Sequence, residues 1–373
     1  MSRAKEEQPK YYSLKNILAK NCVYNVIVGE RSNGKTCSVL EYCLDDYFAN
    51  GRQFAYIRRW GDEVLPKFVN TLFNPPHLLA KIEKLSNGEF NGIVSRAGVI
   101  RFTKYDEKEQ KNKATDKILG YAFSLNAQEH IKSSSYPNVG NILFDEFLTR
   151  RNYLPDEFVL FMNTISTIVR DRDDVKIFMC GNTVNQYSPY IAEMGLSNIK
   201  KQKKGTIDIY TYADCPNLSV AVEYSDFPAK TKPSDKYFGF NNEKLKMITQ
   251  GAWELPVAPH LPRKYNWLTD VLFKYYIIFE GELLQCEIIN VDNTMFTYIH
   301  RWTSEIDQDK ELIYSPAYDV RPNWRRYITR PNDEIDRKIS SFFLKSKVYY
   351  SDNTVAEVVR NYINFSRTDR DLT

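Results

Sequence analysis

Val23-Tyr24-Asn25-Val26-Ile27-Val28, a mainly apolar run, leads directly into Gly29-Glu30-Arg31-Ser32-Asn33-Gly34-Lys35-Thr36. The second stretch fits the phosphate-binding loop pattern, in which two glycines are followed by a lysine and a hydroxyl residue. Glycine permits positive φ angles and close backbone approach, so successive N–H groups turn toward phosphate oxygens. Lys35 adds a charge near the β- and γ-phosphates, Thr36 offers a hydroxyl to Mg²⁺, and the following helix directs its positive dipole end at the anion. The alternative is an ordinary Gly-rich turn, but the strand and helix patterns on either side favour a nucleotide site.

A second apolar run, Asn141-Ile142-Leu143-Phe144, ends in the paired acids Asp145 and Glu146. A buried parallel strand exposes such residues at its carboxyl edge, where open α/β sheets bind ligands. We expect Asp145 to hold Mg²⁺ and Glu146 to accept a proton from the attacking water. Acids also lie at strand ends simply because they are solvated there, which explains one of them better than the pair.

A third apolar run, residues 175–180, is followed by Gly181-Asn182-Thr183. An amide at that position touches both the γ-phosphate and the lytic water, so Asn182 is a candidate sensor of the nucleotide. A turn built on Gly-Asn explains the same residues equally well.

Composition limits the function classes. A net charge of +4 over 373 residues is too small for binding nucleic acid by bulk electrostatics, so any such contact must be local. The six cysteines lack paired spacing and the four histidines are scattered, which implies neither a zinc site nor a disulfide framework. The first ten residues are polar and no apolar run reaches membrane-spanning length, so we expect a soluble protein of a reducing cytoplasm with no membrane contact.

Strand and helix patterns alternate from residue 23 to about residue 180, which is typical of an α/β fold with a mainly parallel sheet and flanking helices. Helices are expected over residues 36–48, 62–73 and 155–169, the second ended by Asn74-Pro75-Pro76. Strands are expected over residues 53–59, 90–94, 99–102 and 121–125, and the polar insert 104–117 is expected to be a mobile surface loop. Two further strands are expected over residues 206–212 and 219–224.

Prolines punctuate residues 225–262, which we assign to a linker or lid between an ATPase domain at 1–224 and a C-terminal domain at 263–373. The C-terminal domain carries three strand patterns at 273–279, 283–289 and 294–300, with Glu280-Gly281 as the first turn. Helical patterns follow at 333–345 and 355–365, so this domain is expected to be α+β.

The chain resembles the DNA-encapsidation ATPases of small tailed phages with protein-primed genomes, which are related to the large terminases. The likeness covers roughly residues 20–195, and the C-terminal part follows only in general layout. It rests on separated stretches: Val26 to Lys35, Gln53 to Arg59, Ser135-Tyr136-Pro137-Asn138-Val139, Phe144-Asp145-Glu146-Phe147, Ile168 to Arg172, and Asn182 with Pro189-Tyr190 beyond. It implies a phosphate-loop ATPase of the type with an additional strand and a catalytic glutamate (ASCE), using ATP and Mg²⁺.

The resemblance also implies an assembly. Five subunits would form a ring at the portal vertex of a procapsid in the host cytoplasm and drive double-stranded DNA into it, with each active site at a subunit boundary. Arg170 matches the arginine that reaches into a neighbour's nucleotide, and Lys132 matches a second basic residue acting across that boundary. Arg31 resembles the loop arginine of large terminases. Each of these cations is otherwise a solvated surface charge.

A motor that moves a whole genome should touch phosphates and not bases. The candidates in the first domain are Arg58 and Arg59 at a strand end, the 104–117 insert, and a basic cluster formed by Lys200, Lys201, Lys203 and Lys204. In the C-terminal domain, Arg325 and Arg326 belong to a basic segment over residues 321–347 with Trp324 and Tyr327 interleaved, for which the resemblance suggests a structured packaging RNA as a partner. Each group is also explained as a solvated protein face.

By its order of strands and helices, the C-terminal domain resembles the ribonuclease H-like nuclease domain of large terminases. An active nuclease needs clustered carboxylates that hold two metals. The first strand has no central acid, and Asp292 and Asp319 lack an obvious partner set, so we expect the fold without the activity. A nuclease-competent terminase, a phosphate-loop helicase and a non-enzymatic portal or scaffold protein are the competing interpretations.

Overall fold

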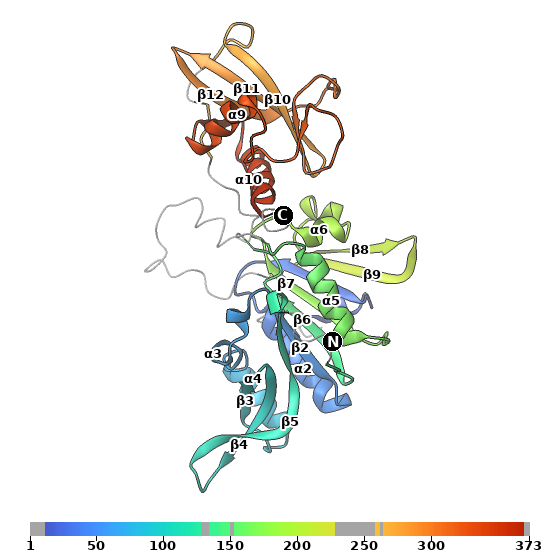
Figure 1. Cartoon of the computed structure of the whole chain (residues 1–373). Coiled ribbons are helices and arrows are strands. Elements are labelled where there is room, and N and C mark those ends of the chain that lie inside the picture. The colour runs from blue at the N-terminus through green and yellow to red at the C-terminus, as the bar shows by residue number, and fades with distance from the viewer. Residues whose placement is uncertain (1–11, 128–133, 150–152, 228–257, 262–263, 369–373) are drawn as a thin grey trace, which may run out of the picture. The chain divides into compact units, whose positions relative to one another are not determined.

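The structure is a computed structural model that describes residues 12–127, 134–149, 153–227, 258–261 and 264–368 (Figure 1). The chain divides into two compact units, residues 1–253 and 254–373. The division falls inside segment 225–262, whose assignment to a linker or lid stays a prediction because residues 228–257 lie outside the described residues. No helix in the described part of the chain is long and apolar enough to cross a membrane.

The first unit is built on a nine-stranded sheet in the order β3-β4-β5-β2-β6-β7-β1-β9-β8. Its strands are β1 (Tyr24–Gly29), β2 (Gln53–Arg58), β3 (Gly92–Arg96), β4 (Val99–Asp106), β5 (Lys111–Ser124), β6 (Val139–Asp145), β7 (Lys176–Asn182), β8 (Thr206–Tyr212) and β9 (Cys215–Tyr224). The core strands β5, β2, β6, β7, β1 and β9 run parallel, while the edge strands β3, β4 and β8 pair antiparallel. Every residue of β1 and β6 is buried, which explains their near-continuous apolar sequences.

Strand β7 lies between β1 and β6, so an additional strand separates the phosphate-loop strand from the strand that carries the acids. The predicted ASCE-type α/β fold is therefore confirmed. Because all three strands are parallel, their carboxyl ends meet at one edge of the sheet. The residues that follow each strand are thereby brought together.

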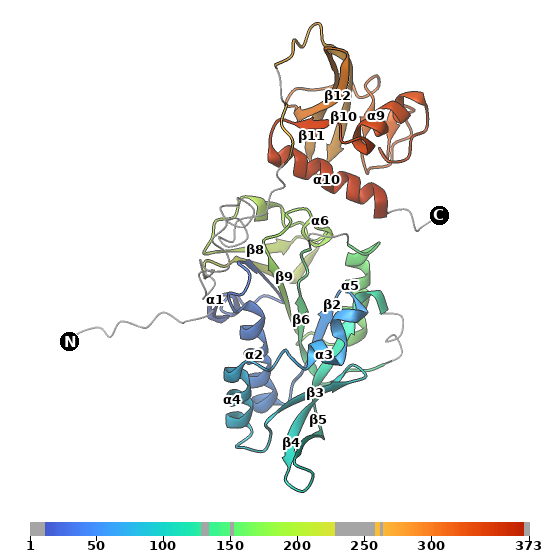
Figure 2. The same ribbon diagram turned by 90° about the vertical axis from the view of Figure 1, so that its left-hand side faces the viewer.

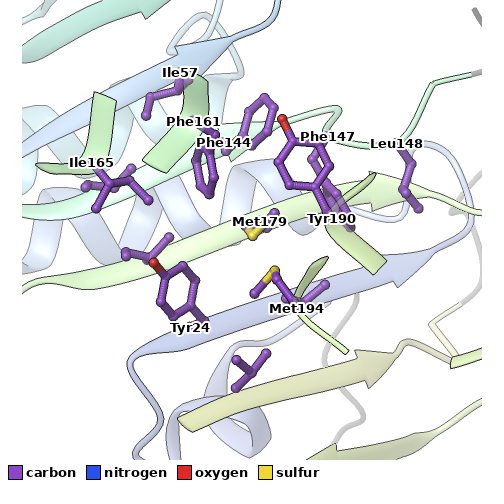
Figure 3. Packing of buried hydrophobic residues seen from close by; sticks show 14 of the residues in the cluster. Tyr24, Ile57, Phe144, Phe147, Leu148, Phe161, Ile165, Met179, Tyr190 and Met194 are labelled. Carbon is purple, nitrogen blue, oxygen red and sulfur yellow. The ribbon is translucent and has the colours of Figure 1, made fainter. Parts of the chain in front are cut away.

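Helices cover both faces of this sheet (Figure 2). They are α1 (Lys15–Leu18), α2 (Lys35–Asn50), the 3-10 helix η1 (Gly61–Val64), α3 (Pro66–Val69), α4 (Pro76–Leu85), α5 (Glu157–Val169), α6 (Pro189–Glu193) and the 3-10 helix η3 (Ser197–Lys200). On one face, α2 and α4 bury apolar residues such as Leu40 and Ile82. On the other face, α5 and α6 pack Phe161 and Tyr190 against Phe144 of β6, with ring centroids 4.9 and 5.4 Å apart (Figure 3).

Three local predictions for the first unit are wrong. Residues 62–73 do not form one helix, because the chain breaks into η1 and α3 where Pro66 starts a new helical turn. Pro76, which was expected to follow a helix end, instead begins α4, since proline is tolerated in a first helical turn.

The polar insert 104–117 is a β-hairpin and not a loop. Strands β4 and β5 stay paired out to Asp106 and Lys111, and Lys113 is ion-paired to Asp106 at 2.7 Å.

The second unit contains a six-stranded sheet in the order β14-β13-β10-β11-β12-β15. Its elements are β10 (Val271–Phe279), β11 (Glu282–Val291), β12 (Thr294–Arg301), β13 (Ile313–Tyr314), β14 (Trp324–Arg325), α9 (Glu334–Leu344), β15 (Val348–Tyr350) and α10 (Asn353–Thr368). Strands β10 to β12 form the predicted antiparallel meander, and β13 and β14 add in parallel beside β10. This arrangement confirms the ribonuclease H-like fold class.

A buried polar cluster lies on the β10–β12 meander. The Glu287 carboxylate, 4% exposed, accepts hydrogen bonds from the Tyr265 hydroxyl at 2.7 Å and the Gln285 amide at 2.6 Å. It also lies 3.7 Å from Nε2 of His300. The contact with Glu287 raises the pKa of His300 above its ordinary value of 6.5, against the effect of burial.

We expect this pair to make the stability of the chain depend on pH. A raised folded-state pKa of His300 means that the pair stabilises the fold fully below about pH 6.5, and that this stabilisation is lost as pH rises through the folded-state pKa. Urea unfolding of the full chain from about pH 6 to about pH 9 should show a steeper fall in unfolding free energy for wild type than for His300→Gln. Equal slopes for the two proteins would contradict the assignment.

Candidate nucleotide site

The phosphate-loop sequence has the predicted local structure. Strand β1 ends at Gly29 and helix α2 begins at Lys35, with Gly34 between them at φ 96°. That angle favours glycine, and at Gly29 a Cβ would lie 3.0 Å from Cβ of Ser225, which is tighter than most packed contacts. Ser32 also has a positive φ, of 62°, so two residues of the loop adopt the left-handed conformation that is found in anion-binding turns.

Lys35 is held inside this loop and is only 5% exposed. Its ammonium group donates to the Glu30 carbonyl oxygen at 2.6 Å, to Asn33 Oδ1 at 3.1 Å and to Asn182 Oδ1 at 3.4 Å. Burial lowers the pKa of Lys35 to about 8, although the nearby Asp145 carboxylate opposes the shift. A buried ammonium bonded to neutral oxygens is suited to exchange one of them for a phosphate oxygen.

Asp145 is the last residue of β6 and points toward the start of α2. Its Oδ1 accepts a 2.9 Å hydrogen bond from the Thr36 hydroxyl. Burial raises the pKa of Asp145, while Arg58 and the bond from Thr36 act in the opposite direction. A hydroxyl and a carboxylate side by side at the phosphate loop fit the usual protein ligands of Mg²⁺ in this class of site.

Glu146 follows Asp145 with φ 56°, a left-handed conformation that is uncommon for a residue with a side chain. The kink turns its carboxylate, 51% exposed, away from the strand and toward the pocket. One carboxylate of the pair is thus buried beside Thr36, and the other reaches solvent.

Asn182 ends β7 and is the strand partner of Gly29. The additional strand therefore delivers its amide to the phosphate loop, beside Lys35. A pocket of about 460 Å³ opens over these groups, which is large enough for a nucleotide. It is lined by Arg31, Ser32, Asn33, Gly34, Lys35, Thr36, Cys37, Pro75, His77, Asp145, Glu146, Cys180, Gly181 and Asn182.

Arg58 belongs to this site, which the sequence analysis missed. Its guanidinium lies 2.8 Å from Glu146, 3.6 Å from Asp145 and 3.0 Å from Glu63. A side chain bonded to these carboxylates and 14% exposed is not available to hold a DNA backbone, so that assignment is corrected. The useful signal was its place at the end of a strand adjacent to the acid-bearing strand, because Ile57 pairs with Phe144.

Arg59 is buried and also cannot contact DNA. Its guanidinium donates to both carboxylate oxygens of Glu157, at 2.9 and 2.7 Å, and to the carbonyl oxygens of Glu146 at 3.3 Å and Phe147 at 2.8 Å. Glu157 accepts further bonds from the Tyr190 hydroxyl and the Leu154 N–H. The expectation for Arg59 was wrong, and its observed role is to hold the backbone that carries Glu146.

Comparison with known proteins gives the family. A model described as podovirus DNA encapsidation protein (Gp16) matches residues 7–215, more than half of the chain. The chain belongs to the podovirus DNA encapsidation protein family. A DNA packaging protein of Bacillus phage phi29 is 26% identical over 355 residues, covering 94% of this chain and 95% of the relative.

Two solved structures share the fold of this encapsidation protein. One is described as the bacteriophage Phi-29 viral genome packaging motor assembly, with a TM-score of 0.55 and 20% identity, covering 95% of this chain and 97% of the other. The second is described as the Phi-28 gp11 DNA packaging motor, with a TM-score of 0.52 and 19% identity, covering 96% of this chain and 98% of the other.

Arg170 does not lie at the nucleotide site of its own chain. Arg170 follows the last residue of α5, which starts near the carboxyl edge of the sheet and runs back to the opposite edge. Its exposed guanidinium donates to the Ser134 carbonyl oxygen at 2.6 Å, just before β6 begins. Lys132, the second predicted boundary residue, lies outside the described residues. Arg31, in contrast, is exposed at the mouth of the pocket.

The other residues predicted to contact nucleic acid differ in how exposed and how fully paired their side chains are. Lys200 lies 4.1 Å above the ring of Tyr187, and Lys201 is exposed. In the second unit, Arg325 is ion-paired with Asp333 at 2.9 Å and Asp336 at 3.0 Å, so its charge is already matched within the fold. This pairing argues against a nucleic-acid role for Arg325.

Arg326 is exposed and lies over the rings of Tyr327 and Phe365, which keeps it a candidate. Asp319, one of the acids considered for a nuclease centre, is bound by Arg321 at 2.7 Å, and this contact lowers the pKa of Asp319 to about 2. Among the described residues, no group of three or more His, Cys, Asp or Glu side chains is placed to hold a metal. The lack of nuclease activity stays a prediction.

Replacing Glu157 should test its role beneath the acid pair. Glu157→Gln leaves the buried Arg59 guanidinium without a charged partner, so we expect the unfolding free energy to fall by about 3–5 kcal/mol. The matched control is Asp174→Asn, which breaks the exposed 2.6 Å pair with Arg52 and should cost at most about 1 kcal/mol. Urea denaturation measures both, and similar losses in the two variants would contradict a structural role for the buried pair.

Proposed function

We propose that this chain is the ATP-driven motor that moves double-stranded DNA into a preformed procapsid, working as a ring at the portal vertex in the host cytoplasm. Membership of the encapsidation protein family supports a role in DNA packaging. The observation that supports ATP hydrolysis as its energy source is the convergence of Lys35, Thr36, Asp145, Glu146 and Asn182 on one pocket.

In this proposal the phosphate loop binds the triphosphate of ATP. Lys35 exchanges a protein oxygen for a phosphate oxygen, and the loop N–H groups bind the other oxygens. Thr36 and Asp145 would hold Mg²⁺, which when bound neutralises charge on the phosphates. Asn182 lies beside Lys35, where its amide can orient the water or the γ-phosphate.

Glu146 is the proposed general base. One oxygen of its carboxylate lies 2.8 Å from the Arg58 guanidinium, and the side chain is 51% exposed, so the other oxygen can accept a proton from water. Arg58 also binds Glu63 at 3.0 Å, which fixes the guanidinium beside the base. Arg58 is thus a proposed positioning residue for Glu146.

Arg170 is the proposed arginine finger, and the geometry supports action on a neighbouring subunit. Helix α5 has 13 residues, so it separates Arg170 from the carboxyl edge of its own sheet by roughly 20 Å. An arginine side chain is too short to cross that distance. A second copy must therefore bring its Arg170 to the pocket, which favours a ring, proposed here as a pentamer.

DNA contact is proposed at the basic cluster beside the phosphate loop. Strand β8 begins where β9 ends, since Thr206 pairs with Tyr224, so the cluster lies at the carboxyl edge. Lys201 and Lys203 are exposed there, and Lys204 lies 3.4 Å from Glu30 of the loop. Arg326 is the remaining candidate in the second unit for DNA or a structured packaging RNA.

Glu146→Gln tests the whole proposal. It should leave the affinity for Mg-ATP within about threefold of wild type while lowering hydrolysis by about 100-fold or more, because only the proton acceptor is lost. Uptake of nuclease-protected DNA into purified procapsids should disappear with it. Glu83→Gln, an exposed carboxylate on α4, is the control and should package normally. Normal hydrolysis by Glu146→Gln would contradict the role of Glu146, and ATP-independent uptake by wild type would contradict the motor.

Complementation tests whether Arg170 acts on a neighbour. Arg170→Ala and Glu146→Gln should each be inactive alone, because an arginine finger is worth about 10³–10⁵ in rate. In a 1:1 mixture, about a quarter of the interfaces pair an intact Glu146 with a neighbour's intact Arg170, so ATP hydrolysis should return. A mixture of Arg170→Ala with the Arg170→Ala/Glu146→Gln double variant forms no complete interface and is the control. No recovery in the first mixture would refute a finger supplied by the neighbour.

A further inference from the structure

The Asn33 side chain is buried inside the phosphate loop and has every polar atom engaged. It is 2% exposed. Its Oδ1 accepts from the Lys35 N–H at 3.3 Å and from the Lys35 ammonium at 3.1 Å. Its Nδ2 donates to the Ser225 hydroxyl at 3.3 Å and to the Phe227 carbonyl oxygen at 3.4 Å. These partners satisfy the hydrogen-bonding groups of the buried amide.

Chemistry fixes the orientation of this amide. Both groups on the Lys35 side are donors, and the Phe227 carbonyl oxygen is only an acceptor. Turning the amide over would place Nδ2 against the Lys35 ammonium and Oδ1 against the carbonyl oxygen of Phe227. The amide oxygen therefore faces Lys35 and the amide nitrogen faces the 225–227 segment. Only this orientation of the side chain satisfies the partners on both sides.

The segment that receives Asn33 follows directly on the last core strand. The Ser225 N–H continues the β9 ladder by donating to the Val28 carbonyl oxygen at 2.8 Å, and the Phe227 N–H donates to the Ser225 hydroxyl at 3.3 Å. The Tyr12 ring packs edge-on against Phe227 with centroids 5.9 Å apart, and the Tyr12 N–H donates to the Asn33 carbonyl oxygen at 3.1 Å. Asn33 is thus bound to this segment directly and through Tyr12.

We propose that Asn33 is a positioning residue that transmits the state of Lys35 to Ser225–Phe227, the segment from which the chain continues toward the second unit. This inference rests on the proposed function, because it needs a nucleotide that recruits Lys35. When a phosphate oxygen captures the ammonium, Oδ1 of Asn33 loses one of its two donors. The amide then shifts, and the bonds from Nδ2 to Ser225 and Phe227 shift with it.

Hydrogen exchange at the Phe227 amide in the full-length protein, with and without Mg-ATPγS, tests the link. In wild type, the nucleotide should change the exchange rate of this amide by about fivefold or more, since its bond to the Ser225 hydroxyl depends on the Asn33 contacts. Asn33→Ser keeps a neutral acceptor near the Lys35 N–H but is too short to reach the segment. Its response, measured at a Mg-ATPγS concentration that saturates each protein, should fall below about twofold.

Asn25→Ala is the matched control. Asn25 is a buried asparagine of β1, the strand that precedes the loop. It is 1% exposed, and its amide donates to the Cys22 carbonyl oxygen at 3.2 Å. Its variant should keep the nucleotide response of Phe227, which separates transmission through Asn33 from general loosening of the unit. If Asn33→Ser does not fold, as judged by its thermal melt, Asn33→Asp replaces it, because a carboxylate has no donor for Ser225 or Phe227.

The outcomes separate this inference from the function on which it rests. A wild-type response that is lost in the Asn33 variant and kept in the Asn25 variant supports transmission through Asn33. A wild type that binds Mg-ATPγS without a change at Phe227, or an Asn33 variant that responds like wild type, overturns the inference and leaves the ATPase standing. A wild type that does not bind Mg-ATPγS overturns both.

Discussion

Parallel pairing of β2, β6, β7 and β1 is the constraint on which the site depends. In this register Gly29 lies beside Asn182, Asp145 beside Cys180, and Phe144 beside Ile57. Four segments from distant parts of the sequence therefore end at one edge, and their next residues meet. Strand β7 has the largest effect on the geometry of the site. It lies between the phosphate-loop strand and the acid-bearing strand, so it separates Lys35 from Glu146 and brings the Asn182 amide to Lys35.

Beneath this edge, the Arg59–Glu157 pair supports an unfavourable backbone conformation. Glu146 has φ 56°, which for a residue with a side chain costs roughly 1–3 kcal/mol. The guanidinium of Arg59 binds the carbonyl oxygens of Glu146 and Phe147, and Glu157 fixes that guanidinium from the start of α5. The buried pair thus holds the proposed base at an angle that the chain alone would not keep. The two adjacent arginines hold different parts of Glu146, because Arg58 binds its carboxylate and Arg59 binds its backbone carbonyl oxygen.

The core strands and the phosphate loop were predictable because apolar runs of strand length have few alternatives. Sheet order was not predictable from local sequence, since it depends on which distant strands share a register. Arg58 shows the consequence: the Glu146 carboxylate that it binds comes from 88 residues away, so it looked like a solvated cation. The prediction of a loop at residues 104–117, where β4 and β5 form a hairpin, was wrong for another reason. The hairpin extends as a polar ladder held by its backbone and by pairs such as Lys113–Asp106, and therefore lacks the alternation of buried and exposed residues that identifies a strand.

The crossover from β6 to β7 explains why one chain alone is incomplete under the proposed mechanism. A right-handed return between parallel strands must run the length of the sheet, so α5 begins beside the acid pair and ends at the far edge. The same covalent connection that fixes Glu157 below Glu146 places Arg170 where its own nucleotide is beyond reach. In the proposed ring this gap would be closed, because each subunit would offer its neighbour the end of the helix that it cannot use itself. Hydrolysis would then require a boundary that is correctly closed, which links each chemical step to the contact between subunits.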